Sequence, residues 1–314
     1  MESQSKMYVG FDIGGTKTSV AYRHGDADAE HIIRFSTHGA NYHRANASQV
    51  IGVIAASLAR IREEAHSDAI IYSVAGVAGA GRSAILNELN QGFVTARTNP
   101  FDRFEAHSDA VIALEGAFSG RAGTILIAGT GSGIFANTDT GDFLRAGGWG
   151  ARLGDPGSGE QIGRRAARAI CMALDGGKST LLSEFLSEKL SERLTVELEI
   201  TDRDGMIAAV NDENLRFSTL APFVFEAAEN GDEVAIKILR TEASELAREA
   251  RLVLDQLDHS RLAIMGGLCQ NPLYRSLLEE ALTSENPNVE FTDPDHPPEI
   301  GALRLAEALS GTDI

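Results

Sequence analysis

One local pattern occurs twice in this chain and limits the folds that the chain can adopt. Residues 7–13 alternate between apolar and small or polar side chains, as a half-buried strand does, and a turn at 14–16 separates them from a second strand-like stretch at 18–22. Residues 123–138 repeat this order around a turn at 129–131. The repeat predicts an internal duplication of an α/β unit, and hence two similar domains with a cleft between them. The simpler alternative is that strand–turn–strand units are common and that the two copies are unrelated.

The remaining hydrophobic pattern predicts helices and strands in alternation, as an α/β fold requires. Further strands are expected at 31–37, 70–77, 104–107, 142–145, 261–265 and 289–292, and helices at 47–65, 82–89, 110–117, 160–174, 232–257, 272–282 and 298–309. A cluster of small residues near position 120 marks the expected boundary. We expect an N-terminal domain of residues 1–120, onto which a C-terminal helix at about 298–314 packs back, and a C-terminal domain of residues 121–297.

The charge of the chain argues against several kinds of partner. Asp and Glu number 45 against 28 Lys and Arg, which gives a formal net charge of −17. Such a surface repels nucleic acids and anionic lipids.

The sequence also contains no sign of a membrane segment or of export. No apolar run approaches the ~20 residues that a membrane span needs, and the N-terminal residues do not resemble a signal peptide. Cys171 and Cys269 form no CxxC pair. We therefore expect a cytoplasmic protein that binds neither nucleic acid nor membranes.

The two glycine turns are candidate phosphate-binding sites. The first turn consists of Gly14, Gly15, Thr16 and Lys17, and the second consists of Gly129, Thr130, Gly131 and Ser132. Glycine brings bare backbone N–H groups close to a ligand, and the hydroxyl groups and the lysine add further partners for an anion. Asp12 precedes the first turn and is expected to hold Mg²⁺ through water, because a carboxylate repels phosphates. Plain hairpin turns are the alternative for both segments.

Asp109 is the candidate catalytic residue. It follows the strand expected at 104–107 and opens a helix, so it should lie at the C-terminal edge of a sheet. Phosphoryl transfer to an alcohol needs a carboxylate that accepts the proton of the hydroxyl group. The alternative is that Asp109 only caps the helix.

Residues 147–159, GGWGARLGDPGSG, are the most unusual segment. The single tryptophan of the chain, Trp149, lies here between Gly148 and Gly150, and Asp155 follows among turn residues. An aromatic face and a carboxylate are the groups that a sugar-binding site uses. The alternative is a glycine-rich loop with a buried tryptophan and a capping aspartate.

Together these segments resemble the N-acetylglucosamine kinase and glucosamine kinase family, the BadF/BadG-type ATPases of the actin-like sugar kinase superfamily. The resemblance rests on DIGGTKT (12–18), HSDA (107–110), AGTGSG (128–133), GGWGARLGDPGSG (147–159) and MGGLCQNP (265–272). These motifs stand in the expected order across residues 8–310. The resemblance implies an α/β fold of two RNase-H-like domains with a nucleotide- and sugar-binding cleft between them.

The resemblance also implies a role for each matching residue. The two glycine turns would bind the phosphates of ATP, Gly266 and Gly267 would bind its adenosine part, and Asp109 would be the catalytic base. The sugar would contact Asn41, Asp109, Gly148, Trp149, Gly150 and Asp155. The implied reaction is the ATP- and Mg²⁺-dependent phosphorylation of N-acetylglucosamine or glucosamine at the 6-hydroxyl, catalysed by a homodimer.

Three other classes of protein share this fold, and each needs a sequence feature that can be looked for in this chain. An ATPase activator subunit that drives electron transfer to an acyl-CoA dehydratase or reductase would share an iron–sulfur cluster, but neither Cys171 nor Cys269 suits one. The zinc-bearing branch of sugar kinases and repressors needs a cysteine-rich loop that this chain lacks. A nucleotide-regulated chaperone or filament protein would carry an added domain or insertions.

Overall fold

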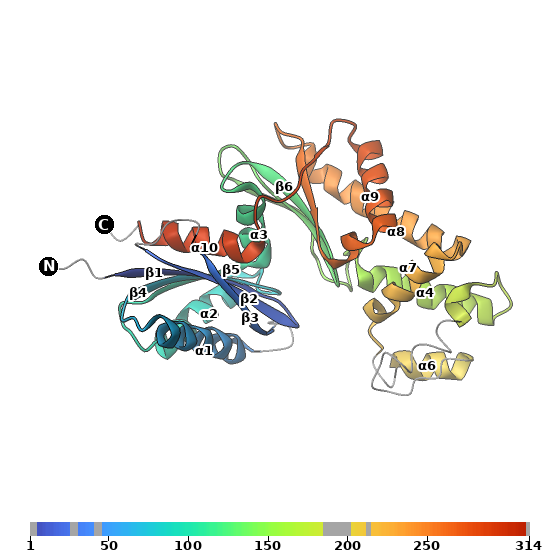
Figure 1. Cartoon of the computed structure of the whole chain (residues 1–314). Helices are drawn as coiled ribbons and strands as arrows, with labels where there is room; N and C mark the ends of the chain where they lie inside the picture. Colours follow the sequence, from blue (N-terminus) through green and yellow to red (C-terminus); the bar gives the residue numbers. More distant parts are fainter. Residues whose placement is uncertain (1–4, 26–30, 41–45, 185–201, 212–214, 312–314) are drawn as a thin grey trace. The chain divides into compact units, whose positions relative to one another are not determined.

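The computed structural model describes residues 5–25, 31–40, 46–184, 202–211 and 215–311. The chain forms two compact units (Figure 1). Unit 1 comprises Met1–Ala122 and Asp293–Ile314, and unit 2 comprises Gly123–Thr292. Each unit is built on one five-stranded sheet.

The sheet of unit 1 has the strand order β3-β2-β1-β4-β5. Its strands are β1 (Lys6–Ile13), β2 (Lys17–His24), β3 (Ile33–His38), β4 (Ile70–Val77) and β5 (Arg103–Ser108). The first three strands pair antiparallel, whereas β4 lies parallel to both β1 and β5. The first glycine turn therefore connects two neighbouring antiparallel strands, as the sequence predicts.

The sheet of unit 2 has the order β10-β9-β6-β7-β8. Its strands are β6 (Gly123–Ala128), β7 (Ser132–Asn137), β8 (Phe143–Gly147), β9 (Arg261–Met265) and β10 (Glu290–Phe291). Again the first three strands pair antiparallel, and β9 lies parallel to both β6 and β10. The two sheets thus share one strand order and one set of strand directions, which confirms the predicted duplication.

Helices cover both faces of the sheet in unit 1 (Figure 1). The inward side chains Met7, Val9, Phe11 and Ile13 of β1 share a core with α1 (Ala47–Ala65) and α2 (Ser83–Ala96). On the other face, α3 (Asp109–Phe118) packs against α10 (Pro298–Leu309), and α10 also contacts β1 and β4. Helix α10 therefore completes the cover over β1.

The core of unit 2 lies between its sheet and a group of helices. These are α4 (Gly159–Leu174), α6 (Arg203–Asn211), α7 (Ala221–Glu229), α8 (Glu233–Leu254) and α9 (Pro272–Glu285), with short 3-10 turns at Phe217–Leu220 and Gly267–Gln270. Alternate β6 side chains, Leu126 and Ala128, join buried residues of these helices in one cluster. Across the described ranges of both units, each helix is too short or too polar to cross a bilayer.

The sequence underestimates one helix of unit 1. The predicted helix at 82–89 extends to Ala96 as α2. Its buried stripe continues from Ile85 and Leu89 to Phe93, and Phe93 stacks on Phe104 with the ring centroids 4.6 Å apart. Polar residues around Gln91 interrupt the apolar pattern in the sequence. The burial of Phe93 is visible only from its packing against β5.

Gly10 on β1 lies against the backbone of α10 and leaves no room for a side chain. A Cβ atom at Gly10 would lie 2.3 Å from the backbone oxygen of Glu299 and from the backbone nitrogen of Leu303. We predict that Gly10→Ala lowers the free energy of unfolding by about 1–3 kcal/mol, because α10 must move away from the sheet. Urea denaturation measures this change.

A matched control is Gly52→Ala in the middle of α1, where a Cβ would have no atom within 4 Å. This substitution should raise stability by about 0.5–1 kcal/mol, because alanine favours the helix over glycine. Equal effects of the two substitutions would contradict the close contact between β1 and α10.

Candidate active site

The parallel strands of unit 1 end at the same level, and this alignment brings the acidic candidates together. Ile13 of β1 is paired with Val77 of β4, and Val77 is paired with Ser108 of β5. The chain then continues into the first turn after Ile13 and into Asp109 after Ser108. Asp109 is close enough for its charge to affect Asp12. Asp12, the first turn and Asp109 therefore lie at one edge of one sheet.

The first turn has a fixed base and an exposed tip. The N–H of Gly14 donates to the carbonyl of Lys17 at 3.0 Å, and the N–H of Ala40 donates to the carbonyl of Gly14 at 2.9 Å. Gly15, Thr16 and Lys17 are exposed. The backbone N–H groups and the hydroxyl at the tip can therefore receive an anionic ligand.

Gly39 supports this turn, although none of the sequence motifs includes it. A Cβ at Gly39 would lie 2.5 Å from both the carbonyl oxygen of Gly14 and the backbone nitrogen of Lys17. The sequence signal that could have indicated its role is its position just after β3, two residues before the predicted sugar contact Asn41. Asn41 itself falls outside the described residues.

Asp12 lies in a region of concentrated negative charge. Burial raises the pKa of Asp12 to about 6, with further contributions from the charges of Asp109 and Glu299, while Lys17 acts in the opposite direction. Glu299 is buried at the start of α10 and forms an ion pair with Arg34 of β3. The edge of the sheet in unit 1 therefore holds Asp12 in a setting where its ionised form is costly.

Asp109 occupies the first turn of α3 and is not its N-cap. The N-cap residue is Ser108, whose side chain makes no capping hydrogen bond. The Oδ1 atom of Asp109 accepts a hydrogen bond from the neighbouring N–H of Ala110 at 3.0 Å. Asp109 therefore lies one residue after the N-cap position and binds one N–H of the first turn of α3, and this partly exposed residue lies at the edge of the sheet.

Unit 2 has an equivalent sheet edge that brings two predicted nucleotide segments together. Ile127 of β6 pairs with Met265 of β9, so the second turn and Gly266 follow neighbouring strands. A Cβ at Gly266 would lie 2.2 Å from the carbonyl oxygen of Ala128, so Gly266 is required by the neighbouring strand itself. Gly267 is exposed like Gly266, but a Cβ added at Gly267 would have no atom within 4 Å.

The second turn is tied to the start of α4. Gly129 donates to the carbonyl of Gly131 at 2.8 Å, and the carbonyl of Gly129 accepts from the N–H of Gly159 at 2.8 Å. Thr130 and Gly131 are exposed. Ser132 is buried and its hydroxyl donates to the carbonyl of Pro156 at 2.7 Å, so this side chain holds the tryptophan-containing loop rather than pointing to solvent.

The tryptophan loop, defined here as residues 147–159, presents its aromatic ring to solvent. Trp149 is 70% exposed, which excludes the alternative of a buried tryptophan. Gly148 and Gly150 on either side have positive φ angles of 64° and 89°, which favour glycine. The guanidinium of Arg145 lies 6.0 Å from the centroid of the ring, and its Nη2 donates to the carbonyl of Gly148 at 3.1 Å.

Asp155 is held inside the tryptophan loop. It is 5% exposed, and its Oδ1 accepts from the N–H of Gly150 at 2.9 Å. Burial raises the pKa of Asp155, while hydrogen bonds from the N–H groups of Gly150, Ser132 and Trp149 act in the opposite direction. Asp155 therefore connects the tip of the loop with the second turn.

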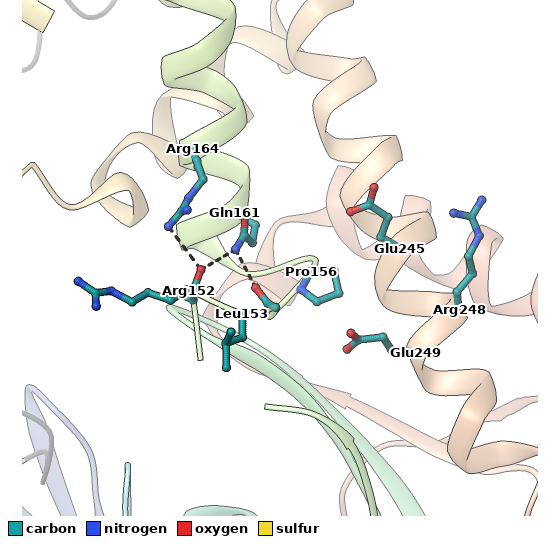
Figure 2. A pocket seen from close by; sticks show the side chains of 10 residues that line it. Arg152, Leu153, Pro156, Gln161, Arg164, Glu245, Arg248 and Glu249 are labelled. Atoms are coloured by element: carbon teal, nitrogen blue, oxygen red, sulfur yellow. Dashed lines mark hydrogen bonds between the residues drawn. The ribbon is translucent and has the colours of Figure 1, made fainter. Parts of the chain in front are cut away.

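A pocket of about 440 Å³ adjoins the tryptophan loop within unit 2 (Figure 2). Its walls are loop residues between 151 and 156 together with side chains of α4 and α8. Gln161 of α4 donates to the carbonyls of Ala151 and Gly154 at 2.9 and 2.7 Å, and so fixes this part of the loop. No local pattern in the sequence points to Gln161, because its role depends on how α4 packs beside the loop.

The fold is that of the sugar kinases, because solved structures of this class share it. A chain from Chromobacterium violaceum, provisionally named N-acetylglucosamine kinase, matches with a TM-score of 0.75 and 25% identity over 96% of this chain and 99% of that chain. A ROK family glucokinase from Streptomyces griseus has the same fold, with a TM-score of 0.56 and 18% identity over 96% and 98% of the two chains.

This chain belongs to the BadF/BadG/BcrA/BcrD ATPase family, whose sequence model matches residues 9–306. An N-acetyl-D-glucosamine kinase from Dictyostelium discoideum is 28% identical over 96% of this chain and 98% of its own length. An N-acetylmuramic acid/N-acetylglucosamine kinase from Clostridium acetobutylicum is also 28% identical, over 64% of this chain and 66% of its own length.

The raised pKa of Asp12 predicts a pH-dependent cost to stability. In the unfolded chain Asp12 ionises near its ordinary value of 3.8, but in the folded chain near 6. The free energy of unfolding should therefore fall as the pH rises from about 4 through about 6, and the cost is fully present above that range. Asp12→Asn should raise the free energy of unfolding by about 2 kcal/mol at pH 8, with a smaller gain at pH 5.

Urea denaturation of both proteins at pH 5 and pH 8 checks this prediction. A gain from Asp12→Asn that is the same at both pH values would show that the substitution acts through packing and not through the charge of Asp12.

Proposed function

We propose that this protein transfers the terminal phosphoryl group of ATP to the 6-hydroxyl of an amino sugar, N-acetylglucosamine or glucosamine. The observation that carries the proposal is the edge of the sheet in unit 1, where a carboxylate at Asp109 and an exposed glycine turn follow aligned strands. The names of the two curated relatives support an amino sugar as the acceptor.

In unit 1, Asp109 is proposed as the catalytic base. Its carboxylate accepts the proton of the 6-hydroxyl as the oxygen attacks the terminal phosphorus and the bond to the leaving ADP breaks. The exposed N–H groups at the tip of the first turn, the hydroxyl of Thr16 and the ammonium of Lys17 bind the phosphate oxygens. Asn41 is proposed as a contact of the sugar on the basis of sequence resemblance alone.

In unit 2, the proposed roles fall on two groups of residues. The second turn at Thr130 and Gly131 binds phosphate oxygens, and the open face of Gly267 allows the adenosine part of the nucleotide to approach the backbone closely. The exposed ring of Trp149 packs against the apolar face of the sugar. Asp155 is proposed to receive sugar hydroxyls on the basis of the sequence resemblance.

The residues of unit 1 fit a magnesium ion that is held through water. In the described ranges, no three His, Cys, Asp or Glu side chains form a set that could bind a metal ion directly. Asp12 is a partly exposed carboxylate beside the first turn, ionised above about pH 6. It can accept hydrogen bonds from the water ligands of an ion bound to ATP. When bound, Mg²⁺ neutralises charge on the phosphates.

The alternative of an electron-transfer activator finds less support. A cysteine that ligates an iron–sulfur cluster does so as a thiolate. Cys269 is 8% exposed, and burial raises its pKa to about 11, so the protonated thiol is its stable form. Cys269 is therefore better explained as a packed core residue.

Two further expectations from the sequence accompany the proposal. A homodimer and a cytoplasmic location stay predictions, and both suit an enzyme that acts on a small sugar and ATP. Sedimentation of the purified protein would determine its oligomeric state.

The proposal is tested by an assay that couples ADP release to a visible signal over a panel of hexoses and hexosamines. ADP release should depend on an amino sugar, and the product should carry its phosphate on the 6-oxygen. ADP release at the same rate with and without every sugar would contradict the kinase function.

Asp109→Asn should lower kcat by about 10²–10⁴-fold in this assay, because the amide cannot accept the proton of the hydroxyl. The matched control is Glu115→Gln on the same helix, whose carboxylate pairs with Arg304 and lies outside the proposed machinery. It should leave kcat within about twofold, since a partly exposed ion pair is worth little to activity. Unchanged turnover in Asp109→Asn would exclude Asp109 as the base.

A further inference from the structure

Gly157 is a buried residue of the tryptophan loop. Its φ angle is 78°, in the left-handed region that favours glycine. A Cβ at this position would lie 2.6 Å from Cδ2 of Leu246 and 2.9 Å from Oη of Tyr274. Side chains of α8 and α9 therefore contact the backbone of the loop directly at Gly157.

The N–H of Gly157 is bound by a buried carboxylate. It donates to Oε2 of Glu242 on α8 at 2.6 Å, and Glu242 is 1% exposed. The other carboxylate oxygen, Oε1, accepts from Arg165 of α4. A buried charge is tolerated only when it is paired, so both oxygens of Glu242 have a defined partner and a defined orientation.

The carbonyl of Gly157 is bound from the other side. Tyr274 on α9 is fully buried and its hydroxyl donates to this carbonyl at 2.8 Å. Burial raises the pKa of Tyr274 well above its ordinary value, so the hydroxyl keeps the proton that it donates. Its ring packs beside Phe225, with the centroids 5.8 Å apart. Gly157 thus has both of its backbone polar groups held by side chains from two different helices.

This arrangement controls the segment that carries Asp155. Asp155 stands two residues before Gly157 and binds the N–H of Gly150. The peptide groups on both sides of Gly157 are fixed by Glu242 and Tyr274, so the direction in which the chain leaves Asp155 is fixed as well. The second turn has its own backbone connection to Gly159 and does not depend on Gly157 alone.

We propose that Glu242 and Tyr274 are positioning residues that orient the tryptophan loop for the amino sugar by clamping Gly157. This inference rests on the proposed function, since the loop is the proposed sugar contact. Neither side chain needs to touch the sugar. They act through the backbone of Gly157 on Asp155 and Trp149.

The test compares Tyr274→Phe and Glu242→Gln with Glu280→Gln in the whole chain. Tyr274→Phe removes a single hydrogen bond and keeps the ring. Glu280→Gln is the matched control, because Glu280 lies on the same helix as Tyr274 and makes an exposed ion pair with Arg240, whereas the backbone of Gly157 binds Glu242 and Tyr274. Steady-state kinetics are measured with the amino sugar and ATP each varied, and thermal unfolding is followed alongside.

Tyr274→Phe should raise KM for the amino sugar about fivefold, the usual effect of one lost hydrogen bond, while KM for ATP stays within about twofold. Glu242→Gln should act in the same direction, and Glu280→Gln should change neither constant. Equal rises in both KM values together with a lower melting temperature would reduce Glu242 and Tyr274 to core residues and overturn the proposal. Wild-type KM values in Tyr274→Phe and Glu242→Gln would overturn it as well.

Hydrogen–deuterium exchange of the free proteins separates this inference from the proposed function. In Tyr274→Phe, amide exchange should quicken in peptides within 147–159 and stay unchanged in β9 and in the first half of α8. Unchanged exchange within 147–159 would refute the clamp. If the wild-type protein phosphorylates no amino sugar, the proposed function fails, and the exchange result still decides whether Tyr274 fixes the loop.

Discussion

The parallel pairing of β4 with β1 and β5 is the constraint on which the proposed chemistry of unit 1 depends. Backbone hydrogen bonds set the register, and the register places the ends of the three strands at one level. The positions of the first turn and of Asp109 then follow from chain connectivity, because the turn comes directly after β1 and Asp109 comes directly after β5. Unit 2 repeats the arrangement with β6 and β9, which places Gly266 beside the second turn. The same strand pairing, used in both sheets, thus positions both of the turns that are proposed to bind the nucleotide.

The same alignment concentrates negative charge. Asp109 and Glu299 raise the cost of ionising Asp12, and the positive groups nearby are Lys17 on the turn and Arg34 beside Glu299. A fold selected only for stability would not place these carboxylates together. Their proximity suits the proposed site, which would accept a proton and bind a metal–nucleotide complex, because such sites gather titratable groups whose pKa values are shifted.

Local patterns predicted much of this structure, and the rest required tertiary contacts. The bounds of β4, β6, β9, α1 and α10 agree with the predicted segments, because strand alternation, helical periodicity and prolines act over short distances. The glycine turns and the unusual loop could be found in the same way. Glu242 and Tyr274 could not, because they lie 85 and 117 residues after Gly157 and meet it only when α8 and α9 pack. The role of Gln161 and the extension of α2 could not be predicted for the same reason.

The return of α10 to β1 has a consequence for synthesis on the ribosome. Residues 123–292 form a continuous segment that emerges before α10 does, so unit 2 can fold while one face of the sheet in unit 1 is still uncovered. The face that receives α10 includes the backbone around Gly10, where the helix approaches too closely for any side chain. Strand β1 therefore acquires its full cover only after residues 298–309 have been translated.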